Sequence, residues 1–150
     1  MYLKAGGLGL LRLTAVAMLA VAIFAISSCS SGQQTKHTGG RVLRIAERDF
    51  KIALPQKRVR GGDVSLLVDN KGPASHELIV IRKGRSRLPL RRDGLTVDED
   101  AVERSIPGAL EPETPGTHLL KVHLTPGRYE LICNMSGHFF GGMRTQLEVQ

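Results

Sequence analysis

Residues 133–143 have the sequence CNMSGHFFGGM, which places three sulfur and nitrogen donors on one short segment. Cys133, His138 and Met143 are spaced five residues apart, and they offer a thiolate, an imidazole and a thioether. These soft and borderline donors are typical of transition-metal sites. Glycines are frequent in the segment and allow the positive φ angles that a tight loop needs. The segment therefore predicts a metal-binding loop.

The residues on both sides of this loop alternate between apolar and polar, as in half-buried strands. Residues 129–133 precede the loop, and residues 145–149 follow it. Side chains of a strand alternate with period two, so Tyr129, Leu131 and Cys133 share one face. Cys133 is therefore expected to point into the end of a core.

Similar alternation recurs upstream, in residues 43–54, 64–68 and 120–124, whereas residues 77–81 form a continuous apolar run. Short strands at this spacing favour an all-β fold, a Greek-key β-sandwich. Residues 83–118 break the alternation. They are predicted to be a long insertion with one short helix, which begins at the capping-box pattern of residues 96–99 and ends near Arg104.

A second imidazole is needed to complete a trigonal site of one Cys and two His with a distant Met, the donor set of electron-transfer copper. His76 stands at the entrance of the strand predicted at 77–81 and is the candidate. Residues 129–149, together with His76, resemble the cupredoxins of the plastocyanin, azurin and rusticyanin type. The resemblance extends over roughly residues 41–150, and only its C-terminal third is specific.

The resemblance implies a type 1 (blue) copper site with one copper ion. His76, Cys133 and His138 would be equatorial ligands, Met143 the axial ligand, and the domain a one-electron carrier with no enzymatic activity. Many cupredoxins have Asn directly after the first histidine, where this chain has Glu77. Asn134 is expected to supply part of the tie between the ligand loops. Phe139 and Phe140 are expected to form an apolar rim for a redox protein partner.

Other interpretations of these residues remain open. Cys133 alone could be a buried thiol and Met143 alone a core residue, and Met135 is interpreted as a packing residue. His118 and His123 are expected at the surface. A second cysteine, which a binuclear copper centre would need, is missing from the loop, and no histidine flanks Cys133 as it does in multicopper oxidases. The alternative function is an exported copper-binding or copper-delivery protein.

The N-terminus has the pattern of an export signal. Lys4 and Arg12 precede an apolar run, residues 13–26, and the sequence ISSC at 26–29 resembles a bacterial lipobox. The expected organisation is a signal peptide over 1–28, a lipidated Cys29, a flexible tether over 29–40 and a copper domain over 41–150. Secretory cleavage after Ser27 and an uncleaved anchor are the alternatives. The domain would then lie outside the cytoplasm, at the periplasmic face or the cell surface.

The chain carries 21 Lys and Arg against 14 Asp and Glu, a formal net charge of +7. The basic residues are scattered except between Arg82 and Arg92, a segment with six cations and no acidic residue. No aromatic residue lies among them, so nucleic acid is not an expected partner. The segment is either a solvated loop or a docking site for an acidic redox partner or anionic lipid. We expect a monomer.

Overall fold

The computed structural model describes residues 41–150. The predicted signal peptide, the lipidated Cys29 and the tether lie outside the described residues. Within the described part of the chain, no helix has the length and apolar character needed to cross a membrane.

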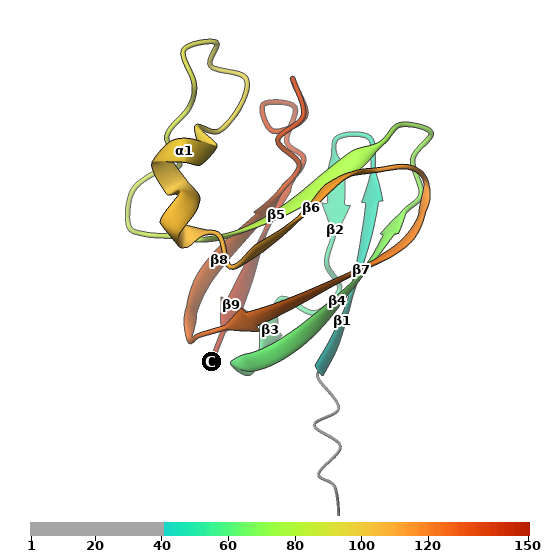
Figure 1. Ribbon diagram of the computed structural model, residues 1–150, viewed down its shortest axis with the longest axis vertical. Coiled ribbons are helices and arrows are strands. Elements are labelled where there is room, and N and C mark those ends of the chain that lie inside the picture. The colour runs from blue at the N-terminus through green and yellow to red at the C-terminus, as the bar shows by residue number, and fades with distance from the viewer. Residues whose placement is uncertain (1–40) are drawn as a thin grey trace, which may run out of the picture. The chain divides into compact units, whose positions relative to one another are not determined.

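Within residues 41–150, nine strands form two sheets (Figure 1). The four-stranded sheet has the order β2 (Lys51–Ala53), β1 (Arg41–Arg48), β4 (Gly62–Asn70) and β7 (Gly116–Leu124). The five-stranded sheet has the order β3 (Arg58–Val59), β9 (Arg144–Val149), β8 (Gly127–Ile132), β5 (His76–Arg82) and β6 (Gly108–Glu113). The pairs β1/β4 and β3/β9 are parallel and the others antiparallel.

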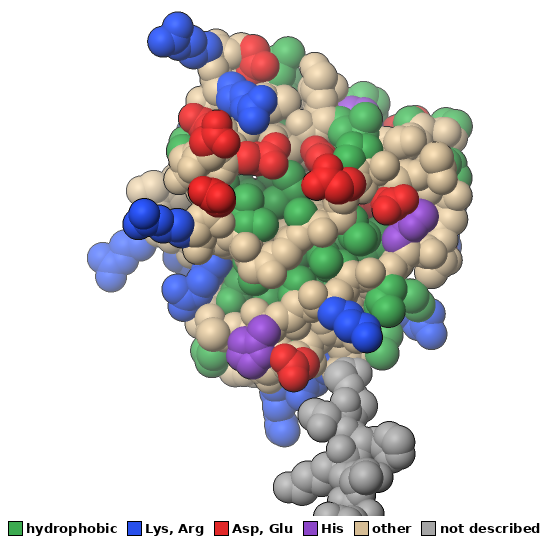
Figure 2. All heavy atoms as spheres, in the orientation of Figure 1, with side chains coloured by type: hydrophobic (Ala, Val, Ile, Leu, Met, Phe, Trp, Pro, Cys, Tyr) green, Lys and Arg blue, Asp and Glu red, His purple; other side chains and the backbone are tan. Residues whose placement is uncertain are grey.

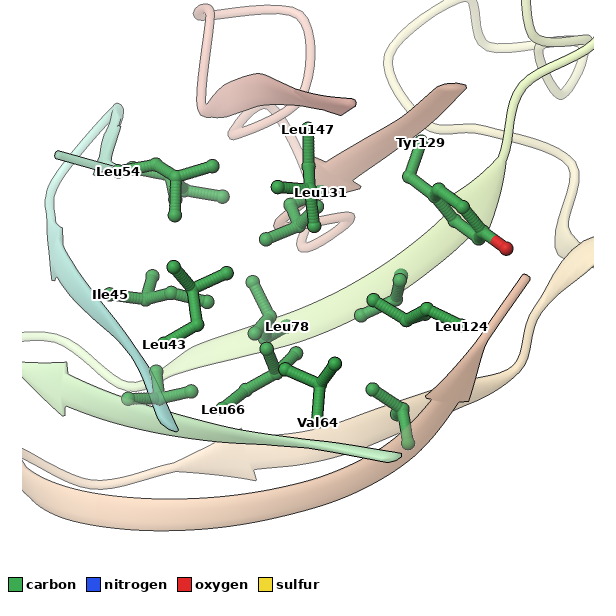
Figure 3. Close-up of a cluster of buried hydrophobic side chains, with 14 of the residues drawn as sticks. Leu43, Ile45, Leu54, Val64, Leu66, Leu78, Leu124, Tyr129, Leu131 and Leu147 are labelled. Atoms are coloured by element: carbon green, nitrogen blue, oxygen red, sulfur yellow. The ribbon is translucent and has the colours of Figure 1, made fainter. Parts of the chain in front are cut away.

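The inward-facing side chains of both sheets meet in one aliphatic core (Figure 3). Leu43 on β1 and Leu66 on β4 face Leu78 on β5 and Leu131 on β8, and all four are at most 2% exposed. Burial of this apolar area stabilises the sandwich at roughly 25 cal/mol per Å². The predicted all-β sandwich is confirmed.

Strand β5 is covered on both faces, as its continuous apolar sequence predicted. Leu78 and Val80 face the main core, whereas Ile79 and Ile81 belong to a second cluster. That second cluster lies under the segment that follows β5, and it includes Val97, Val102, Ile132 and Phe139.

The structure of residues 83–118 differs in part from the prediction. The short helix exists as α1 (Glu99–Val102) and continues as a 3-10 turn, η1 (Glu103–Ser105). Its N-cap is Asp98, whose carboxylate accepts a hydrogen bond from the Ala101 N–H at 3.4 Å. The prediction missed β6, which pairs with β5, and the early start of β7 at Gly116. Strand β6 has the sequence GALEPE, which contains too few apolar residues to show alternation.

A second difference concerns Phe50, which the sequence pattern placed in a strand. Phe50 lies in the turn between β1 and β2 with φ of 60°, and its side chain is 54% exposed. A bulky residue at positive φ is strained and is found mainly in turns and functional sites. Phe50 therefore lies on the surface at the end of the sandwich.

Candidate metal centre

Three predicted ligands meet at one end of the five-stranded sheet. Cys133 directly follows β8, His76 begins β5, and His138 lies on the loop between β8 and β9. One ligand atom from each residue lies within 4.8 Å of the others, and Cys133 Sγ is 3.3 Å from His138 Nδ1. Cys133 and His76 are buried, whereas His138 is half-buried. The residues that the sequence predicted as equatorial ligands are therefore adjacent in space.

Backbone hydrogen bonds close the loop that carries the C-terminal donors. The Cys133 N–H donates to the Met143 carbonyl at 3.0 Å, and the Met143 N–H donates to the His138 carbonyl at 2.9 Å. Gly137 and Gly142 have φ of 81° and 99°, where a Cβ would be strained. Met143 is fully buried in the same core cluster as Cys133. Its role as an axial ligand remains a prediction.

His76 is held between the metal-ligand loop and a carboxylate. Its Nε2 lies 3.2 Å from Asp49 Oδ1, an ion-pair distance whose angles do not satisfy hydrogen-bond geometry. Within residues 41–150, neither ring nitrogen has a hydrogen-bond partner although both are buried. Burial and the nearby His138 lower the pKa of His76, and Asp49 opposes this effect. A neutral imidazole with an unpaired nitrogen is the form that binds a metal ion.

Close packing around His76 requires a glycine at position 72. A Cβ on Gly72 would lie 2.8 Å from His76 Nε2 and 2.9 Å from Asp49 Oδ1. Asn70 shapes this turn, because its side-chain oxygen accepts a hydrogen bond from the Gly72 N–H at 3.0 Å. The turn before β5 thus fixes the position of the imidazole.

Burial raises the pKa of the Cys133 thiol. The backbone N–H groups of Glu77 and Met135 oppose this effect and lower the pKa of the thiol. Such donors stabilise a thiolate, which is the metal-binding form of cysteine. The Glu77 backbone therefore contributes to the site even though its side chain differs from the asparagine common in cupredoxins.

Asn134 ties the ligand loop to the segment before α1. Its amide donates to the Val97 carbonyl at 3.0 Å and to Glu99 Oε1 at 2.7 Å, and its oxygen accepts from the Val97 N–H at 2.6 Å. Burial raises the pKa of the Glu77 carboxyl, and the backbone N–H of Asn134 opposes this effect. The sequence predicted that Asn134 would help to tie the ligand loops, and most of its hydrogen bonds go instead to the insertion.

Two acidic residues near the site were missed by the sequence analysis. Glu47 is 2% exposed, and burial, followed by the charge of Glu77, raises its pKa to about 7. Glu47 occupies an inward position of β1, two residues after Ile45, so the alternation of that strand could have identified it. Asp49 lies in the turn between β1 and β2, and no alternation pattern in the sequence marks it as a neighbour of His76.

The aromatic residues of the loop have different environments. Phe140 is 72% exposed, as expected for an apolar rim. Phe139 is 6% exposed and packs in the second core cluster, so its side chain does not form a surface rim. The ring of Phe50 lies 5.3 Å from that of His138, measured between centroids. Phe50 and Phe140 are thus the exposed aromatic residues beside His138.

The remaining candidates lie where the sequence placed them. Met135 packs against the main core. His123 is exposed on β7 and binds Asp63 at 2.8 Å, and His118 contacts the Thr114 carbonyl at 2.9 Å. The described residues form one group of three or more His, Cys, Asp or Glu side chains able to hold a metal ion, namely His76, Cys133 and His138. This donor set, with a buried unpaired imidazole, fits copper.

Comparison with protein-family models gives no match, and comparison with curated protein sequences gives none either. Solved structures do match. A reduced auracyanin from Roseiflexus castenholzii is 17% identical over 74% of this chain and 98% of its own, with a TM-score of 0.56. Auracyanin B is 17% identical over 73% of this chain and 88% of its own, with a TM-score of 0.57.

Rusticyanin from Thiobacillus ferrooxidans is 18% identical over 74% of this chain and 79% of its own, with a TM-score of 0.54. Rusticyanin is described as a copper protein. At these identities the likeness establishes the fold. The chain therefore has the cupredoxin fold, with His76, Cys133 and His138 as a possible ligand set for one copper ion.

Proposed function

We propose that this domain is a one-electron carrier with one type 1 copper ion. The observation that carries the proposal is the cluster of His76, Cys133 and His138, whose ligand atoms lie within 4.8 Å of one another. A trigonal set of one thiolate and two imidazoles is the donor set of electron-transfer copper, and Met143 would add the weak axial thioether. Bound copper would supply the exchange between Cu(I) and Cu(II).

The chain itself would make this exchange fast by holding the donors still. Cys133 and Met143 belong to the main core, and His76 is fixed between Asp49 and the turn at Gly72. Packed interiors resist displacement, so the donor geometry would change little between the two oxidation states. His138 is half-buried and has Phe50 at its side, which makes its outer edge the shortest route to a partner.

Copper delivery is the alternative function, and burial argues against it. A delivery protein must release its metal to another protein, which requires accessible donors. Here Cys133 is 0% exposed and His76 is 1% exposed. We therefore expect bound copper to be lost slowly to a soluble chelator. We assign no enzymatic activity to the domain.

The location of the domain follows from the N-terminal sequence. We propose that the signal peptide directs export and that lipid on Cys29 holds the domain at the outer face of a membrane. An extracytoplasmic place agrees with the export signal predicted at the N-terminus.

The ligand roles can be tested with a matched pair of methionine variants. Met143→Leu should keep copper but raise the reduction potential, because Cu(II) gains more than Cu(I) from an added donor. Met135→Leu should leave the potential unchanged, since Met135 is a packing residue. His76→Ala should weaken or distort the site. Cyclic voltammetry and the copper stoichiometry of each variant measure these effects.

A shift of the potential in Met135→Leu with none in Met143→Leu would show that the axial assignment is wrong. Uptake of copper by His76→Ala with unchanged stoichiometry, colour and potential would remove His76 from the ligand set.

A further inference from the structure

A groove of about 730 Å³ lies beside the candidate metal centre. It runs between the start of the insertion and the strands β8 and β9, and we call it the insertion groove. Its lining combines cationic and apolar side chains: Lys83, Arg87, Leu88, Leu90, Glu130, Phe139, Phe140, Arg144, Thr145 and Gln146. It contains Phe139 and Phe140, so it begins one residue from His138.

The charge of the groove is positive. Its one acidic residue, Glu130, is buried and binds Lys83 at 2.9 Å and Arg144 at 4.0 Å. The single negative charge of Glu130 therefore neutralises only part of the positive charge of Lys83 and Arg144. Arg87 on the groove, and Arg85, Arg91 and Arg92 beside it, are exposed, and within residues 41–150 no carboxylate lies within ion-pair distance of them. Of the six cations between Arg82 and Arg92, Lys83 pairs with Glu130 and Arg91 lies near the charge of Asp93, so the uncompensated charge is carried mainly by Arg85, Arg87 and Arg92.

Exposed apolar side chains lie among these cations. Leu90 is 46% exposed and Phe140 is 72% exposed, and both line the groove. Arg144 stacks on the buried Phe139 ring at 4.8 Å, which fixes the floor of the groove. An aromatic and an aliphatic anchor surrounded by arginines is the composition of protein interfaces.

A second surface distinguishes a protein partner from a membrane. Helix α1 and the turn η1 carry Glu99, Asp100 and Glu103, and Val102 of α1 packs in the same cluster as Leu88 and Phe139 of the groove. Figure 2 shows acidic side chains gathered over α1 and β6, with Lys and Arg at the margin. A broad anionic surface, such as a lipid bilayer or a nucleic acid, would contact the acidic side chains of α1 as well as the cations of the groove. A protein of limited size can contact the groove alone.

We infer that the insertion groove docks a redox protein whose surface is acidic around its own cofactor. This inference rests on the proposed electron-carrier function and names the partner of that site. The arginines steer the acidic surface toward the groove, and Leu90 and Phe140 anchor it. The cofactor of the partner is then brought next to His138.

The test uses two probes and two charge reversals on the metal-free domain. The probes are plant-type ferredoxin, an acidic one-electron protein, and cytochrome c, a basic one. Arg87→Glu with Arg91→Glu reverses the groove, and Arg44→Glu with Lys121→Glu makes the same change of charge on exposed positions of β1 and β7. Dissociation constants are measured at low ionic strength, and amide NMR shifts locate the contact.

We expect ferredoxin to bind the wild type more tightly than cytochrome c does and to shift the amides of Leu90 and Phe140. The groove variant should weaken ferredoxin binding by roughly tenfold or more, and the control variant by much less. Phe140→Ser should weaken binding at both low and high salt, because it removes an apolar contact.

Equal weakening by both charge reversals, or equal binding of the two probes, would overturn the inference. So would a groove variant that binds ferredoxin normally but loses binding to phosphatidylglycerol vesicles, which would assign the groove to a lipid surface. The proposed function is tested separately: a domain that binds ferredoxin at the groove but takes up no coloured copper would contradict the electron-carrier function and leave the docking site in place.

Discussion

The buried carboxylate of Glu47 links the stability of the domain to pH. Burial raises its pKa to about 7, against 4.5 as the ordinary value. A carboxyl with a raised folded-state pKa binds more protons when folded, so the folded chain loses stability as the pH rises from 4.5 through 7. The difference between these two pKa values corresponds to a loss of about 3 kcal/mol in the free energy of unfolding above pH 7.

Glu47→Gln should remove this loss. The metal-free variant should match the wild type in free energy of unfolding near pH 4.5 and exceed it by about 3 kcal/mol at pH 8, as measured by urea denaturation. Glu103→Gln, on the exposed turn η1, serves as the control and should show no such trend. A constant difference between Glu47→Gln and the wild type at all pH values would show that Glu47 does not titrate in this way.

Asp49 Oδ1 lies 3.2 Å from Nε2 of His76, an ion-pair distance, so the carboxylate is the charged group in contact with this imidazole. A carboxylate near the second nitrogen of a metal-binding histidine fixes the ring and increases its basicity, and its loss commonly costs 10- to 100-fold in metal affinity. We expect Asp49→Asn to weaken Cu(II) binding by about tenfold or more and to raise the reduction potential. Asp63→Asn is the matched control, because Asp63 lies 2.8 Å from His123 at the start of β4, whereas the turn that leads to His76 follows the other end of that strand, at Asn70.

Some residues of the candidate metal centre could be predicted from the sequence, and others could not. Cys133, His138 and Met143 are close in sequence, so their spacing predicted a common loop. Asp49 and Phe50 reach His76 and His138 only through the tertiary fold. Their type and position in the sequence carry no pattern that marks them as neighbours of a metal centre.

Among the elements, strands with an apolar and a polar face were predicted, whereas the two-residue β3 and the edge strand β6 were missed. Strand β4 alternates between buried and partly exposed residues, and the last four residues of β8 are all buried, because both strands face the main core. Strand β6 lies on the edge of its sheet and has no buried residue, and it forms through pairing with β5, about thirty residues away in the chain. Edge strands of this kind depend on long-range pairing rather than on their own composition.

The insertion depends on one side chain of the ligand loop. Asn134 makes three hydrogen bonds to Val97 and Glu99, and removing a partner of buried polar groups costs about 1–3 kcal/mol for each group left unpaired. Asn134→Ala should therefore destabilise the domain by about 3 kcal/mol in urea denaturation and accelerate hydrogen exchange of the Val97 amide. Asp93→Ala, which removes an exposed turn contact to Leu95, should have a smaller effect. Unchanged exchange at Val97 would show that Asn134 does not hold the segment.

At the scale of the whole molecule, the domain presents its functional surfaces at one end. His138, Phe50 and Phe140 lie on the loops beyond β8 and β1, and the insertion groove begins beside them. Strands β1 and β4 are parallel, and Arg41 at the start of β1 pairs with Val64 near the start of β4. The turn that leads to His76 follows the opposite end of β4, at Asn70. Arg41 therefore lies at the end of the sandwich away from the candidate metal centre.

The anchor is tested on the full chain. Cys29→Ala should release the domain from the membrane fraction or leave its precursor unprocessed, because lipid can no longer be attached. Cell fractionation and the mass of the mature protein measure this outcome. Processing and fractionation of the variant identical to those of the wild type would show that Cys29 is not the anchor.

The central claim, a type 1 copper site, is tested most directly by the visible spectrum of the purified domain after addition of one equivalent of Cu(II). A buried thiolate bonded to copper gives an intense charge-transfer band, so the wild type should become blue or green. Cys133→Ser should abolish the band, while Ser136→Ala, an exposed change in the same loop, should preserve it. A colourless wild type, or a band that survives in Cys133→Ser, would contradict a blue-copper site in this domain.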